Sequence, residues 1–223
     1  MEMMPYRPAA DRPERSHLAP SLPTWGPAAR RDWREGLPVL RGLGLTLREL
    51  TAADAPALAA QLTTAEVSRF ISPPPTSVAG FERFIAWTHK ERAAGRYACF
   101  AVVPDGGTAA VGIFQIRLLA DRDGVAEWGF ILGEAHWGTG LFLAGAQCVV
   151  DFAFVEMGQH RLEARAAVAN GRGNGALKKL GAVPEARLRQ SFQRHGERLD
   201  QTLWGLVRED WLAAPAVRVP SVH

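Results

Sequence analysis

The chain has 223 residues, of which 47% are hydrophobic and 22% are charged, and its formal net charge is +3. This length holds one domain with a sizeable core, or one domain and an extension. The basic residues are nearly all arginines scattered along the chain, with no basic stripe interleaved with aromatic residues, which argues against nucleic-acid binding. The N-terminal segment lacks the features of a secretory signal, so we expect a cytoplasmic protein.

Residues 1–44 are rich in proline and arginine and show no sustained hydrophobic period. We expect them to form an N-terminal extension that is partly flexible. Trp25 and Trp33 indicate that part of this extension packs on the body of the protein, because fully disordered tails seldom keep large aromatic side chains.

Regular patterns begin at Leu45. Thr51 is a plausible N-cap for the first helix, and Gly95 is a suitable stop for the second. Turns at 105–107 and 121–124 join three strands into an antiparallel meander. From alternation and helical spacing we expect strands at 45–50, 97–104, 109–119, 125–132, 160–168, 186–194 and 199–207, and helices at 51–62, 81–95, 141–156 and about 173–180.

The strand at 125–132 is followed by a helix and then by the strand at 160–168. A right-handed crossover of this kind places the two strands side by side and parallel. The apolar run from Leu141 to Val155 is interrupted by polar residues and is shorter than the roughly 20 residues of a membrane span, so we expect it in a core and expect no membrane association. The two cysteines, Cys99 and Cys148, offer neither a disulfide framework nor a metal-ligand cluster, and we predict buried free thiols and no metal site.

Two glycines, Gly138 and Gly140, stand immediately before the helix at 141–156. The first turn of a helix has N–H groups without partners and a positive partial charge. Glycines let an anion approach these groups closely, which suits a phosphate or pyrophosphate. The loop lacks the Gly-Lys-Ser/Thr ending of a Walker loop and the spacing of the dinucleotide fingerprint, and alone it is a weak signal.

At this point the sequence resembles a family. The stretch "EWGFILGEAHWGTGLF" (127–142) resembles the fourth strand and pyrophosphate loop of the GNAT acetyltransferases, specifically of the RimJ/RimL-type branch. The stretches "LTLRELTAADAPAL" (45–58), "VANGRGNGALKKLGA" (168–182) and "HGERLDQTLWGLVREDW" (195–211) are similar to other parts of that branch and follow in the expected order. The resemblance covers residues 45–211 and leaves 212–223 as a C-terminal tail.

The resemblance implies an α+β fold with three layers: a mixed, mostly antiparallel sheet of six to seven strands, with one splayed parallel pair, between helices. It implies acetyl-CoA as cofactor and an amine as acceptor, either a protein N-terminus or a small molecule, in a monomer or homodimer. The N–H of Ile131 or Leu132 would face the thioester oxygen. The residues implied in cofactor binding are Phe130, Ile131, Leu132, Trp137, Gly138, Thr139, Gly140, Leu141, Phe142, Asn170, Gly173 and Lys179.

The sequence departs from the family at several positions that carry chemistry. Gly173 replaces a serine, Ala135 replaces a glutamine or arginine, and the later helix has no tyrosine to serve as general acid. Among candidate bases Glu127 ranks first, acting directly or through a water, and the alternative is a strand-end carboxylate paired with an arginine. The other candidates are His195, His136 and Asp200.

Two functions remain open at this point. The first is an N-acetyltransferase that works by direct attack of the amine, with Glu127 and the N–H of Leu132 as its catalytic groups. A weak base would favour an α-amine or another amine of low pKa. The second is a non-catalytic module that binds or senses an acyl-CoA.

Overall fold

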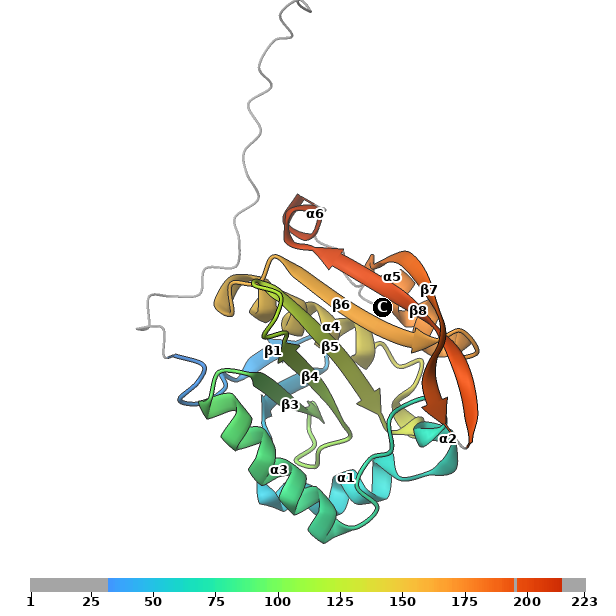
Figure 1. The fold of residues 1–223 in the computed structure, drawn as a ribbon. Helices are drawn as coiled ribbons and strands as arrows, with labels where there is room; N and C mark the ends of the chain where they lie inside the picture. The colour runs from blue at the N-terminus through green and yellow to red at the C-terminus, as the bar shows by residue number, and fades with distance from the viewer. Residues whose placement is uncertain (1–31, 195, 214–223) are drawn as a thin grey trace, which may run out of the picture. The chain divides into compact units, whose positions relative to one another are not determined.

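The computed structural model describes residues 32–194 and 196–213, which build one eight-stranded sheet with helices on its two faces (Figure 1). The strands lie in the order β1-β2-β3-β4-β5-β6-β8-β7. They are β1 (Leu40–Gly42), β2 (Leu45–Glu49), β3 (Tyr97–Pro104), β4 (Gly112–Leu118), β5 (Val125–Leu132), β6 (Arg161–Ala167), β7 (Val183–Arg194) and β8 (Glu197–Val207). The α-helices are α1 (Ala55–Leu62), α2 (Ala65–Ser68), α3 (Val78–Ala93), α4 (Leu141–Asp151), α5 (Gly171–Leu180) and α6 (Arg208–Ala213).

The predicted meander is confirmed, because β3, β4 and β5 pair consecutively and antiparallel. Side chains of β3 alternate between two cores. Ala98 and Phe100 belong to the core under α4 and α5, whereas Cys99 and Ala101 belong to the core under α1 and α3. A strand that is buried on both faces reads as a continuous apolar run, as "YACFAVV" does.

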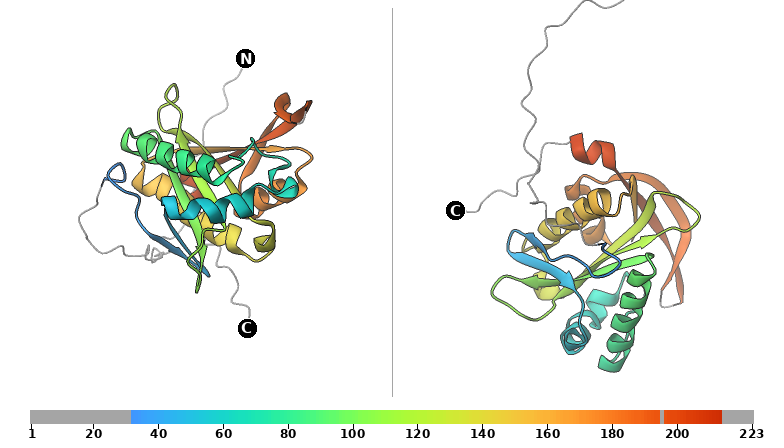
Figure 2. Two further views of the ribbon diagram at one scale, coloured as in Figure 1. Left: turned by 90° about the horizontal axis from the view of Figure 1, so that it is seen from below. Right: turned by 90° about the vertical axis from the view of Figure 1, so that its left-hand side faces the viewer.

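The helices divide between the two faces of the sheet, with α1 and α3 on one side and α4 and α5 on the other (Figure 2). The helix α3 begins earlier than predicted, at Val78, because Ser77 accepts a hydrogen bond from the Gly80 N–H at 3.1 Å and caps it. The helix α4 ends at Asp151 and continues as a π-helical turn, η3 (Phe152–Glu156), so the predicted helix at 141–156 comprises two segments.

The mixed, mostly antiparallel sheet with one parallel pair is confirmed, and it has eight strands rather than six to seven. The additional strand is β1, which lies in the segment expected to be an extension and pairs antiparallel with β2. Trp33, in the same segment, is buried in the core with β1, as its size led us to expect. Trp25 lies outside the described residues.

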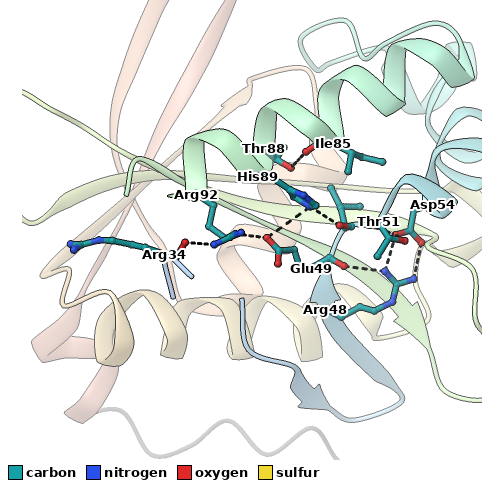
Figure 3. A network of polar contacts seen from close by, with 10 residues as sticks. Arg34, Arg48, Glu49, Thr51, Asp54, Ile85, Thr88, His89 and Arg92 are labelled. Carbon is teal, nitrogen blue, oxygen red and sulfur yellow. Dashed lines mark hydrogen bonds and ion pairs between the residues drawn. The ribbon is translucent and has the colours of Figure 1, made fainter. Parts of the chain in front are cut away.

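A polar network fixes the end of β2 against α1 and α3 (Figure 3). The buried Asp54 carboxylate accepts two hydrogen bonds from Arg48, each of 2.7 Å, and one from the Thr51 N–H at 2.8 Å. Thr51 caps the short 3-10 helix η1 (Ala52–Asp54) that leads into α1, so its predicted capping role holds. Glu49 pairs with Arg92 of α3.

The β7–β8 hairpin carries two register shifts, between Pro184 and Ala186 and between Leu188 and Phe192. Within the second shift Gln190 has a positive φ of 50°. The Asp200 carboxylate accepts from the Gln190 N–H at 2.8 Å and from Arg187 at 2.7 Å. Asp200 is therefore a structural acceptor that holds this bulge.

Candidate active site

The cleft begins where β5 and β6 separate. Their parallel pairing is limited to three residue pairs and ends at Glu127 and Glu163, whereas β6 pairs with β8 along its whole length. Figure 1 shows the two strands diverging beyond that point. The second half of β5 therefore has a sheet partner only on its β4 side, and its other edge is open to a ligand.

The backbone pattern decides which N–H groups face this opening. The Gly133 N–H donates to Val111 at 2.8 Å, and the Leu119 N–H donates to Val125 at 3.2 Å, which fixes the hydrogen-bonded pairs of the β4–β5 ladder. Because N–H directions alternate along a strand, the Ile131 N–H points to β4, and those of Phe130 and Leu132 point to the cleft. Of the two predicted donors to a thioester oxygen, Leu132 has the required direction.

The loop that follows β5 runs through the 3-10 helix η2 (Glu134–His136) and enters α4 at Leu141. Gly138 and Gly140 have φ values of 75° and 89°, a left-handed region that disfavours side chains, and Gly140 is the N-cap of α4. A Cβ atom added at either glycine would meet no atom within 4 Å. The loop is therefore open above the first turn of α4, and it fits a pyrophosphate by both its shape and its N–H groups.

Trp137 closes one side of this opening. Its indole N–H donates to the Leu132 carbonyl at 2.9 Å, and its ring carries the Arg172 guanidinium 3.6 Å from the centroid. Trp137 follows β5, whereas Arg172 lies in the first turn of α5 after β6, so their contact bridges the two separated strands. Beneath it Phe130 and Phe142 pack with ring centroids 4.3 Å apart.

The start of α5 is held by its own cap. The Asn170 side chain accepts from the Gly173 N–H at 2.9 Å, and a Cβ at Gly173 would lie 2.6 Å from the Asn170 amide nitrogen. Asn174, which sequence reasoning missed, donates to the Ala167 carbonyl at 2.8 Å and accepts from the Trp204 indole at 2.9 Å. These bonds fix α5 against β6 and β8, and the only sequence signal for them is a second asparagine four residues after the first.

Lys179 lies in the last turn of α5, whereas Arg172 lies in the first. Seven residues of helix separate the two by roughly 10 Å along the axis. Because Arg172 contacts Trp137, which directly precedes the glycine loop, Arg172 lies nearer to that loop than Lys179 does.

Within the glycine loop, Thr139 donates its hydroxyl to the His136 carbonyl at 2.8 Å.

Two carboxylates stand opposite each other where the cleft begins. Glu127 pairs with Arg117 of β4, in accordance with the alternative that the sequence left open. Glu163, its partner in the β5–β6 register, is buried and accepts two bonds of 2.9 Å from Arg122 and one of 2.9 Å from Arg161. The Arg122 hydrogen bonds hold the pKa of Glu163 below its ordinary value, so this carboxylate stays charged. Sequence reasoning missed it, although the predicted pairing of the strands would have placed it there.

The cysteines, Tyr97 and the candidate histidines contribute less to the chemistry of the site. Both cysteines are free thiols as predicted, but only Cys99 is buried, whereas Cys148 is half-buried. Burial raises the pKa of the Cys148 thiol to about 11 and raises that of Cys99 further, so neither provides a thiolate near neutral pH. Tyr97 is buried, and its hydroxyl donates to Gln115. His136 offers its backbone carbonyl to Thr139, and His195 lies outside the described residues.

The sheet, the open strand edge and the glycine loop together define a scaffold for a cofactor that carries phosphates. Residues 44–183 match the family model described as acetyltransferase (GNAT) domain. The chain belongs to this family, and the resemblance found in the sequence is confirmed.

Individual relatives agree with this assignment. An uncharacterized N-acetyltransferase, p20 from Bacillus licheniformis, is 24% identical over 168 residues, which is 75% of this chain and 94% of that protein. Mycobacterium smegmatis RimJ in complex with CoA-disulfide superposes with a TM-score of 0.70 at 20% identity, covering 78% of this chain and 87% of that one. Spermidine N-acetyltransferase from Vibrio cholerae, in complex with CoA and spermine, gives a TM-score of 0.67 at 19% identity over 76% of this chain and 99% of that one.

The chain is therefore an acetyltransferase with a GNAT fold, and RimJ is among its structural neighbours. Within the described ranges, 32–194 and 196–213, no helix has the length and hydropathy needed to cross a membrane.

Proposed function

We propose that the protein is a cytoplasmic N-acetyltransferase that transfers an acetyl group from acetyl-CoA to a primary amine by direct attack. The observation that carries this proposal is the combination of the open Gly138–Gly140 loop with the unpaired edge of β5. Acetyl-CoA, when bound, supplies an acetyl group activated as a thioester. The solved RimJ neighbour holds a CoA-disulfide, which supports the same cofactor here.

The chain's own groups would divide the work of binding and orientation. The N–H groups from Gly138 to Phe142 would bind the pyrophosphate, since a helix start with unpaired N–H groups attracts anions. The N–H of Phe130 would pair with the pantetheine arm, and that of Leu132 would donate to the thioester oxygen. A donor fixed in a strand needs no reorganisation as negative charge develops on that oxygen. Asn170 would hydrogen-bond pantetheine, and Lys179 would attract a phosphate from the last turn of α5.

The acceptor is best chosen by its pKa. Freeing a lysine-like amine of pKa about 10.4 at pH 7 costs roughly 4 to 5 kcal/mol, whereas an α-amine with a pKa near 8 costs only about 1. Glu127, the proposed base, also forms an ion pair with Arg117. The site therefore suits an α-amine, such as a protein N-terminus, and positioning supplies most of the acceleration.

A leaving thiol needs little assistance, because its pKa is near that of cysteine, about 8.5. Glu127 remains the proposed base, acting directly or through a water. It lies on the same strand as Leu132, at the point where the cleft begins.

The experiment is to incubate the purified protein with acetyl-CoA and a panel of amines and to follow thiol release. The panel contains α-amine peptides, small amines and lysine side chains blocked at their α-amines. We expect turnover with α-amine acceptors, slower turnover with the blocked lysines, and an acetylated product by mass spectrometry. No turnover with any amine would contradict an enzymatic function.

A second candidate is a non-catalytic acyl-CoA-binding module. The observation that favours it is the engagement of two polar side chains near the cleft: Asn170 caps α5, and Glu127 is paired with Arg117. Calorimetric titration with coenzyme A separates the two candidates. Tight binding with no thiol release from any amine would support the module.

A further inference from the structure

A hollow of about 320 Å³ lies between the segment after α2 and the β7–β8 hairpin. Its lining consists of Arg69, Phe70, Ala169, Arg194, Glu197 and Leu199. Ala169 directly precedes Asn170, so the hollow borders the end of β6, on the side where β5 and β6 have separated. Figure 1 places α2 beside the β7–β8 turn at this end of the sheet.

The walls of the hollow are tied together. Arg194 of β7 donates from Nε and Nη2 to the Ser68 carbonyl at 3.2 and 2.9 Å, which joins the hairpin to the end of α2. The two segments are 126 positions apart in the chain. The hollow is therefore a product of the fold and is not formed by one loop alone.

The chemistry of the lining combines apolar walls with an excess of positive charge. Phe70, Ala169 and Leu199 supply the apolar part. Arg69 lies over the Phe70 ring, 5.1 Å from its centroid, and within the described parts of the chain neither Arg69 nor Arg194 forms an ion pair with a carboxylate. Among the described residues, the lining thus contains two guanidinium groups and one carboxylate, that of Glu197.

We infer that this hollow receives the acceptor and selects a peptide N-terminus with an acidic side chain within a few residues of its α-amine. This inference rests on the proposed acetyl transfer. In the part of the chain that the structure describes, the guanidinium of Arg69 has no carboxylate partner, and its planar fork of donors matches a carboxylate. A polyamine would bring a second cation to a site that already has a positive excess, and like charges repel. The acceptor thus differs in charge from the spermine held by the spermidine N-acetyltransferase neighbour.

The test compares three peptide amides that differ only at the second residue, Ala-Glu-Phe, Ala-Gln-Phe and Ala-Lys-Phe, together with spermidine. Their kcat/KM values are measured by thiol release from acetyl-CoA. The expected order is glutamate, glutamine and then lysine, with the glutamate peptide about tenfold above the glutamine peptide, as for one charge-assisted hydrogen bond. Spermidine is expected to be the poorest acceptor.

Two variants locate the preference. Arg69→Ala should lower kcat/KM for the glutamate peptide about tenfold and so remove the preference for glutamate over glutamine. Glu197→Gln should raise kcat/KM for the glutamate peptide, because it removes the one carboxylate of the lining. Arg83→Ala is the matched control and should change nothing, because Arg83 is an exposed arginine of α3 that does not line the hollow.

Equal kcat/KM values for the glutamate and glutamine peptides would overturn the inference, as would a preference that survives in Arg69→Ala. Thiol release from none of the amines would contradict the proposed function instead. The inference then still has a direct readout in an NMR titration. The Ala-Glu-Phe amide should bind more tightly to the wild-type protein than to the Arg69→Ala variant. Equal binding to both proteins would overturn it.

Discussion

Arginines play different parts in two regions of this molecule. Around the end of β2 they are matched with acids: Arg48 binds Asp54, and Arg92 binds Glu49 (Figure 3). Two arginines, one beside the glycine loop and one in the hollow, contact a ring or a carbonyl instead. Arg172 lies on Trp137, and Arg194 donates to the Ser68 carbonyl.

The contrast indicates where the fold has completed its interactions and where it has left capacity for a ligand. A guanidinium that is bonded to a buried carboxylate has little to offer an incoming anion, and removing it leaves a buried charge. A guanidinium that stacks on an aromatic ring keeps its N–H donors free in its own plane, so it remains able to bind phosphate or carboxylate. The first region should therefore respond to mutation in stability and the second in ligand affinity.

The largest effect is expected from breaking the Arg48–Asp54 pair. Arg48→Met leaves the buried Asp54 carboxylate without its cation and should lower the free energy of unfolding by about 3 kcal/mol. Chemical denaturation measures this loss. The double variant Arg48→Met/Asp54→Leu should recover much of it, and a single variant as stable as wild type would contradict the role of the pair.

The same pair sets a pH dependence. Burial raises the pKa of Asp54, but the bonds from Arg48 and Thr51 outweigh burial and leave this pKa below its ordinary value. The stabilisation is therefore complete above the ordinary aspartate pKa of about 4 and is lost as the pH falls through the lower folded-state pKa. The midpoint of denaturation, followed from pH 6 to pH 2, should fall less steeply in the double variant than in wild type.

The next effect is expected at Glu127, which is matched with an acid-binding arginine, Arg117, yet lies at the start of the cleft. Glu127→Gln should lower kcat by about 100-fold at pH 7, the lower end of the range for a general base, with little change in the KM for acetyl-CoA. Steady-state kinetics with an α-amine peptide measures it. An unchanged kcat would show that Glu127 is only the structural partner of Arg117.

A smaller effect is expected from Arg172→Ala, which removes an arginine that has no acid partner within residues 32–194 and 196–213. The Kd for coenzyme A should rise about tenfold, because one charge-assisted contact to phosphate is lost, and the stability should hardly change. Calorimetry with coenzyme A and with pantetheine, which lacks the phosphates, provides the contrast. If both ligands weaken equally, Arg172 acts through Trp137 rather than on a phosphate.

The smallest effect is expected from Lys179→Ala. Lys179 is exposed in the last turn of α5, about 10 Å along the helix from Arg172, so its attraction to a phosphate is screened by salt. The Kd for coenzyme A should rise two- to threefold at low ionic strength and hardly at all at 0.5 M salt. A tenfold rise that persists at high salt would place Lys179 in direct contact with a phosphate.

The meander and the parallel pairing of β5 with β6 could be predicted from the sequence because both depend on local patterns, whereas the cleft between those two strands was implied by the family resemblance. The meander, the crossover to β6 and the glycine loop each have a signal within a few residues. The short strand β1 gave no such signal, since three residues cannot show a period, and its pairing with β2 depends on tertiary contacts.

The state of the site side chains could not be predicted in the same way. Whether Glu127 is paired depends on Arg117 in the adjacent strand, and the burial of Glu163 depends on Arg122 and Arg161. The capping of α5 by Asn170 likewise follows from a rotamer that the sequence does not encode. Such contacts come from register and packing, which composition and spacing leave undetermined.

The most direct test of the account is a calorimetric titration of coenzyme A into wild-type protein and into a Gly138→Val/Gly140→Val variant that circular dichroism shows to be folded. A Cβ added at either position meets no atom within 4 Å, although the positive φ values strain a side chain there, and the valines crowd the N–H groups of the loop. Losing two charge-assisted bonds to phosphate, each about 1.5 kcal/mol, predicts at least a 100-fold rise in Kd. An unchanged Kd in the folded variant would contradict the assignment of the glycine loop as the phosphate site.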